Sequence, residues 1–169
     1  SIRKQSDNGK YISHIQYIDM DKKFTKILNV SNHEVIPIGD LGCYDEHGIF
    51  PINVLKHENK IYAYLSGWSR RVSVSVETGI GLAMSYDDGK TFKRLGNGPV
   101  LTSSLSEPYL VVDGFVKNYD GIFHMWYIYG TDWTQIDRKS EPERTYKIGH
   151  AISLDGINWK KELKQIIQD

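Results

Sequence analysis

Short runs of apolar and aromatic residues, separated by turn-forming residues, recur along most of the chain. Four such runs follow one another in its first part and predict strands at residues 50–55, 61–65, 80–86 and 91–95. The same order of four returns later, at residues 109–116, 122–129, 146–153 and 159–163. An amphipathic helical period is lacking, except for a weak one after Lys160. The pattern therefore predicts an all-β chain made of four-stranded antiparallel units.

A repeated turn phrase marks these units. Residues 85–92 have the form Ser-x-Asp-x-Gly-x-Thr-aromatic, residues 153–159 repeat it with one residue fewer, and residues 17–24 hold a degenerate copy. The aromatic residues that close the three copies lie 68 and 67 residues apart, at Phe24, Phe92 and Trp159. A period this regular indicates stacked supersecondary units, and four short antiparallel strands per repeat are typical of a β-propeller blade.

The turn phrase has a local structural task. Asp87 is expected to accept backbone hydrogen bonds within its turn, Gly89 to take a positive φ, and Phe92 to pack back into the unit. The phrase resembles the Asp box of sialidases and related propellers, where it is a folding element remote from the active site. We therefore take it as evidence for the fold and not for the function.

The strand count predicts about two and a half blades of one partial propeller that occupies residues 1–169. Residues 11–30 supply the outer half of a blade, residues 43–100 a full blade and residues 107–165 another. An open ring leaves strand edges unpaired, and unpaired edges invite pairing with another chain. We expect either a homodimer that closes one ring or a longer protein of which these residues are part, and no stable monomer.

Composition and charge narrow the classes of partner. Lys and Arg together number 21, as do Asp and Glu, so the zero net charge gives no electrostatic argument for nucleic acid or an anionic membrane. No apolar run reaches the 18 residues of a membrane span, and the first residues lack the apolar stretch of a signal peptide. Cys43 is the single cysteine, which favours a reducing compartment. We expect a cytoplasmic protein that binds neither nucleic acid nor membrane.

Function in a propeller is expected where the innermost strands converge on the central tunnel. The two innermost strands are predicted at residues 48–54 and 111–116, and polar residues precede each of them. These are Asp45, Glu46 and His47 before the first, and Glu107 before the second. The second strands of the two units end at Trp68 and at Asp132-Trp133. An aromatic ring at such a rim either stacks on a sugar or covers a blade edge, and the sequence leaves both open.

A succession of phrases carries a family resemblance: Gly48-Ile49-Phe50-Pro51, Tyr64-Leu65-Ser66-Gly67-Trp68, Gly81-Leu82-Ala83-Met84-Ser85, His124-Met125-Trp126-Tyr127 and the stretch from Tyr146 to Trp159. It resembles the five-bladed propellers related to glycoside hydrolase families 32 and 43. More closely, it is similar to a poorly characterised branch whose members accompany surface-polysaccharide genes. The resemblance covers residues 11–163. It implies a five-bladed ring, a carbohydrate partner, and glycosyl hydrolysis or transfer in polysaccharide metabolism.

The hydrolases of that superfamily use three carboxylates that face the tunnel, which follows the two-carboxylate logic of glycoside hydrolysis. By the resemblance, Asp45 stands near the place of the first. Asp113 keeps the second without the flanking Arg and Pro of the hydrolase phrase, and Glu107 is the nearest substitute for the acid. These three are the expected catalytic residues. The expected substrate-binding residues are Glu46, His47, Trp68, Asp132 and Trp133.

Other interpretations of these residues stay open. Residues 45–47 are also typical of a polar loop, and Asp113-Gly114 of a bulge or turn. His124 and His150 alternate within strands and are expected to be packed or exposed. Because no histidine pair has zinc spacing and no phosphate-binding loop is present, we expect neither metal nor cofactor. The alternative function is a non-catalytic propeller module that binds glycan or protein, and a third is a purely structural role.

Overall fold

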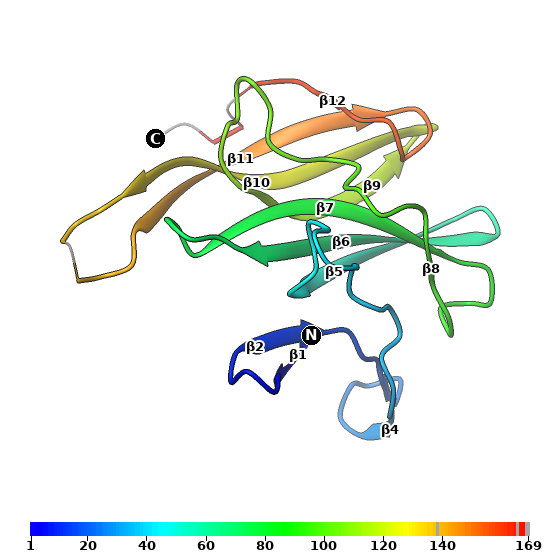
Figure 1. Cartoon of the computed structure of the whole chain (residues 1–169). Helices are drawn as coiled ribbons and strands as arrows, with labels where there is room; N and C mark the ends of the chain where they lie inside the picture. The colour runs from blue at the N-terminus through cyan, green and yellow to red at the C-terminus, as the bar shows by residue number, and fades with distance from the viewer. Residues whose placement is uncertain (138, 165, 168–169) are drawn as a thin grey trace.

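The computed structural model describes residues 1–137, 139–164 and 166–167. Gln165, where the second full blade is expected to end, lies outside them. Every regular element within the described residues is a β-strand, so the all-β class is confirmed. Accordingly, the described part of the chain contains no helix that could cross a membrane. The strands form two larger sheets and a separate hairpin (Figure 1).

The first sheet contains the earlier four-stranded unit. Its strands pair antiparallel in chain order: β5 (Gly48–His57), β6 (Lys60–Arg70), β7 (Val76–Ser85) and β8 (Lys93–Arg94). A hairpin of β1 (Ile2–Gln5) and β2 (Tyr11–His14) extends the sheet beyond β5 through a parallel bridge from Ser13 to Gly48.

The second sheet repeats the order of the first. Its strands are β9 (Val111–Tyr119), β10 (Ile122–Thr134), β11 (Glu143–Ser153) and β12 (Lys160–Lys161), again antiparallel neighbours. Only two residues of each outer strand pair with its sheet, which is fewer than the sequence predicted. Short outer strands are one way in which proteins limit exposed sheet edges.

The N-terminal segment is divided between two places. β2 joins the inner edge of the first sheet, whereas β3 (Ile18–Met20) and β4 (Ile27–Val30) form the separate hairpin. The apolar residues between and beyond these hairpins pack on one face of the first sheet, where Ile15, Val35 and Ile36 meet Ile49 and Leu65. The assignment of residues 11–30 to the outer half of a blade stays a prediction.

The two sheets share the main apolar core, and β9 lies across the first sheet (Figure 1). One hydrogen bond reaches β9 from each of three neighbouring strands. Thr78 of β7 donates to the Val111 carbonyl, Ser66 of β6 accepts from the Asp113 N–H, and Asn53 of β5 accepts from the Val116 N–H, each at 2.9 Å. Between these bonds lie buried side chains of both sheets: Tyr62, Tyr64, Ile80, Leu82, Met84, Val111, Val116, Phe123, Met125 and Tyr127.

Each turn phrase holds its own turn together. The Asp87 carboxylate accepts hydrogen bonds from the Thr91 N–H at 2.9 Å and the Thr91 hydroxyl at 2.6 Å, and Gly89 takes a φ of 86°. Asp155 and Asp21 bind the backbone N–H groups that follow them in the same way. Phe92 and Trp159 pack against the two cores as expected, whereas Phe24 is 78% exposed.

The turn of Asp87 should make stability depend on pH in acid. Hydrogen bonds from Thr91 lower the pKa of Asp87 to about 2. Because the unfolded chain has a carboxyl pKa near ~4, the stabilisation is fully present above about pH 4 and is lost as the pH falls toward 2. Asp87→Asn should therefore flatten the free energy of unfolding between pH 2 and 5, measured by urea titration.

The matched control is Asp88→Asn, which changes the neighbouring, exposed carboxylate that pairs with Lys56 at the surface. We expect it to leave the acid dependence as in the parent protein. An Asp87→Asn variant whose stability falls in acid as steeply as that of the parent would contradict the prediction.

Candidate functional site

The two inner strands, β5 and β9, both contain an irregularity near their start. In the first sheet the pairing passes from Ile49–Gly67 to Ile52–Leu65. In the second it passes from Val112–Ile128 to Phe115–Trp126, so that Asp113 and Gly114 together lie opposite one residue. Asp113-Gly114 is therefore a β-bulge, one of the two local conformations that the sequence left open. Bulges re-aim side chains and are common next to active sites.

Asp113 has an unusual backbone and an open side chain. Its φ is 55°, in the left-handed region that non-glycine residues seldom occupy. The N–H of Asp113 is held by Ser66, while its side chain lies on the exposed side of β9. Partial desolvation raises the pKa of the Asp113 carboxyl, and its hydrogen bond with Ser66 opposes this rise. Gly114 lets the strand approach the core, since a Cβ there would stand 3.0 Å from Ile80.

The register of the two sheets makes Asp45 and Glu107 equivalent residues. The inner hairpins close at His57–Lys60 and at Tyr119–Ile122, an offset of 62 residues, and the same offset relates Asp45 to Glu107. Both side chains are buried at the entry to an inner strand, at 0% and 5% exposure.

Each of these carboxylates pairs with a cation from the outermost strand of its own sheet. The Arg94 guanidinium of β8 donates to Asp45 at 2.6 Å and to the Pro37 carbonyl at 3.1 Å. The Lys161 ammonium of β12 pairs with Glu107 and donates to the Thr102 carbonyl at 2.7 Å. The two blades thus repeat one device, a buried ion pair that spans the sheet from its inner entry to its outer edge.

Aromatic side chains complete both ion pairs. The Tyr127 hydroxyl donates to Glu107 at 2.9 Å, and burial together with Glu107 raises the pKa of Tyr127. Tyr44 lies beside Asp45 in a furrow of glycines, where a Cβ on Gly81 would stand 1.8 Å from the tyrosine oxygen. These contacts give Asp45 and Glu107 a structural task. A catalytic role for either stays a prediction, and the contacts do not favour it.

The mouth residues of the first sheet form a packed stack. Trp68 is 7% exposed and stacks on Phe50, with ring centroids 5.5 Å apart, and on His47 at 5.9 Å. The Arg70 guanidinium lies 5.1 Å from the Trp68 ring. Desolvation, together with Arg70, lowers the pKa of His47. Glu46 accepts the Gly42 N–H at 2.9 Å. Trp68 therefore covers a blade edge in this structure, and its role in substrate binding stays a prediction.

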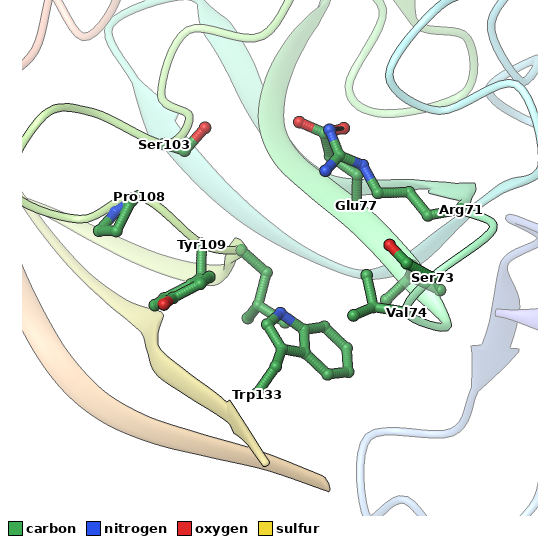
Figure 2. Close-up of a pocket in the computed structure, with 10 residues that line it drawn as sticks. Arg71, Ser73, Val74, Glu77, Ser103, Pro108, Tyr109 and Trp133 are labelled. Carbon is green, nitrogen blue, oxygen red and sulfur yellow. Dashed lines mark ion pairs between the residues drawn. The ribbon is translucent and has the colours of Figure 1, made fainter. Parts of the chain in front are cut away.

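A cavity of about 320 Å³ lies where the β6–β7 hairpin, the segment before β9 and the end of β10 meet (Figure 2). Trp133 and Tyr109 supply aromatic rings to it, and Arg71 and Glu77 form an ion pair at its wall. The neighbouring Asp132 instead accepts the Thr134 hydroxyl at 2.8 Å. Sequence reasoning missed Tyr109, although the 62-residue offset that relates the blades pairs it with His47.

A histidine pair lies on the exposed face of the second sheet. His124 Nδ1 is 3.1 Å from His150 Nε2, and His150 Nδ1 is 2.8 Å from the Glu162 carboxylate. This hydrogen bond lowers the pKa of Glu162. The rings of both histidines stack with Trp126. The described residues contain no group of three His, Cys, Asp or Glu side chains arranged to hold a metal ion.

Replacing the cation of a buried ion pair should be costly. Arg94→Met would leave the Asp45 carboxylate buried without its charged partner, and such a loss costs about 3–5 kcal/mol. The exposed Lys56–Asp88 pair offers the matched control, because exposed pairs contribute ~1 kcal/mol or less. Urea unfolding of Arg94→Met and Asp88→Ala gives both values. The double variant Arg94→Met/Asp45→Asn should recover part of the loss, and a loss below ~1 kcal/mol in Arg94→Met would contradict the assignment.

Comparison of the chain with known sequences gives distant relatives. No protein-family model matches the chain. Two uncharacterised proteins, from two strains of Mycobacterium tuberculosis, are 28% identical to it over 143 residues. The match covers 81% of this chain and 44% of each relative, so the chain spans less than half the length of these curated relatives.

Solved structures with a similar fold are carbohydrate-active enzymes. A glycoside hydrolase superposes with a TM-score of 0.58 at 18% identity, over 82% of this chain and 39% of the other. A member of family GH130, from work on hydrolases that target β-1,2 mannosidic linkages in Candida mannan, gives 0.54 at 21% identity, over 70% and 32%. Sucrose-6-phosphate hydrolase from Lactobacillus gasseri gives 0.54 at 15%, over 79% and 26%. The chain therefore has a glycosidase-like fold that corresponds to part of a β-propeller.

Proposed function

We propose that this chain is part of a propeller that hydrolyses or transfers glycosyl groups in polysaccharide metabolism. The observation that carries the proposal is Asp113, a carboxylate at a bulge of an inner strand, with a φ of 55°. Strained backbone of this kind clusters at active sites. The glycosidase-like fold and the aromatic cavity at Trp133 support the same proposal.

Asp113 has the properties that glycoside chemistry requires of one of its two carboxyl groups. That chemistry uses one group as an acid with a raised pKa and a second as a base or nucleophile. The raised pKa of Asp113 suits the first of these tasks, and its open side chain gives a substrate access. Asp45 and Glu107 would first have to exchange Arg94 and Lys161 for substrate, so we give the central role to Asp113.

A second candidate function is non-catalytic binding of a glycan or protein. The buried ion pairs of Asp45 and Glu107 favour it, because they leave Asp113 as the one open side chain among the three predicted catalytic residues. Trp133 and Tyr109 would then act as the binding surface. The two candidates differ in one measurable respect, which is whether a bound glycoside is cleaved.

Replacing Asp113 tests the leading proposal. Asp113→Asn keeps the size of the side chain and a residue type that tolerates a left-handed backbone, but removes the titrating group. Activity of the whole protein on a panel of aryl glycosides should fall by about 10²–10⁴-fold, the usual contribution of an acid–base group. Asp132→Asn, which changes an exposed carboxylate at the end of β10, should keep the parent activity.

Activity that Asp113→Asn leaves unchanged would remove Asp113 from catalysis. A parent protein that cleaves no aryl glycoside, yet retains oligosaccharides on a glycan array, would favour the binding module instead.

The open sheet faces lead us to propose self-association, as a homodimer or through further blades of a longer chain. Phe115 is 49% exposed and packs with Trp126 on the outer face of the second sheet, whereas Val116 is buried in the seam between the sheets. Light scattering should therefore show the 169-residue chain as dimers or larger species. A monodisperse monomer that unfolds cooperatively at dilute concentration would contradict this.

A further inference from the structure

The cavity at Trp133 lies beside Asp113 and yet is separate from it. Leu110 lines the cavity, and Asp113 comes three residues later along the same strand. At ~3.3 Å per residue, the two places are about 10 Å apart. This is farther than the width of one pyranose ring, so a single sugar cannot occupy both. Successive units of one chain could.

The fold fixes the position of the cavity relative to Asp113. Glu77 forms part of the cavity wall, and the next residue, Thr78, donates its hydroxyl to the Val111 carbonyl at 2.9 Å. The wall on β7 and the start of β9 are therefore joined directly beside the cavity. A group held in the cavity has a defined place with respect to the bulge, which is the condition for positioning a substrate.

The lining of the cavity suits a sugar ring. Tyr109 is 38% exposed, and its ring and that of Trp133 both border the cavity (Figure 2). Arg144 lies 5.5 Å from the Trp133 ring and helps to hold it in place. The exposed Arg71–Glu77 ion pair and the Ser103 hydroxyl add polar groups that can bond to hydroxyls. A few polar groups among aromatic rings is the usual composition of a small-molecule site.

We infer that this cavity is a subsite for a sugar unit of the substrate other than the units joined by the bond that is processed at Asp113. The natural substrate is then an oligosaccharide or polysaccharide, and not a glycoside of a single sugar. The inference rests on the proposed function, because it takes Asp113 as the reacting end of the site. Trp133 is the residue that distinguishes long from short substrates.

Nuclear magnetic resonance of the tryptophan indole N–H groups tests this inference on the whole protein. The probes are trisaccharides of mannose, arabinose, fructose and rhamnose, each compared with the methyl glycoside of the same sugar. At least one trisaccharide should shift the Trp133 signal and leave that of the buried Trp68 unchanged, while its methyl glycoside binds at least tenfold more weakly.

Variants then separate stacking from structure. Trp133→Ala should weaken binding of that trisaccharide at least tenfold, Trp133→Phe should weaken it less because a ring remains, and Tyr86→Ala, an exposed aromatic outside the cavity, should have no effect. The inference is overturned if no trisaccharide shifts the Trp133 signal, or if Trp133→Ala binds as the parent does.

Asp113→Asn distinguishes failure of the subsite from failure of the proposed function. If the subsite is real, this variant should keep the trisaccharide-induced shift at Trp133 while it loses cleavage. A retained shift together with unchanged cleavage would leave the subsite standing and remove Asp113 from the reaction. Cleavage that depends on Asp113 without any shift at Trp133 would do the reverse.

Discussion

The crossing of β9 over the first sheet is the contact on which the rest of the structure depends. Three strands in succession each give one side-chain hydrogen bond to its backbone, through Thr78, Ser66 and Asn53. Each such bond adds only about 1 kcal/mol, so apolar burial between the bonds supplies most of the stability of this seam. The bonds instead set the register, and register decides which side chains of β9 face the core and which stay open. The seam thus places Asp113 outside and Val116 inside.

The repeated ion pairs show how one sequence pattern can serve two tasks. A carboxylate before an inner strand is typical of a tunnel-mouth residue, and it is equally suited to tie the entry of that strand to the outer edge of its blade. The second task applies in this structure, because Asp45 meets Arg94 and Glu107 meets Lys161 in places with little water. A lone buried charge would be strongly destabilising, so each blade needs carboxylate and cation together.

The sequence predicted the parts of the molecule that depend on neighbouring residues. The turns at Asp87 and Asp155 follow from bonds within five residues, and the strand order follows from alternation and turns. The fate of Asp45 depends on Arg94, which is 49 residues away, and no local pattern shows that contact. Likewise, Tyr109 reaches the cavity only because β9 and β10 bring it beside Trp133 and the distant β6–β7 hairpin.

The backbone at Asp113 argues for a task beyond folding. A left-handed conformation costs a non-glycine residue about 1–2 kcal/mol, and glycine would adopt it freely. The hydrogen bond from its N–H to Ser66 involves only backbone on the Asp113 side, so glycine would keep that bond as well. The next residue, Gly114, already supplies the close approach to Ile80 and Met125. Neither the seam nor the bulge therefore needs a carboxylate at this position. What the carboxylate adds is a titrating group on the open side of an inner strand, with its pKa raised by partial desolvation, and that is a property a substrate can use.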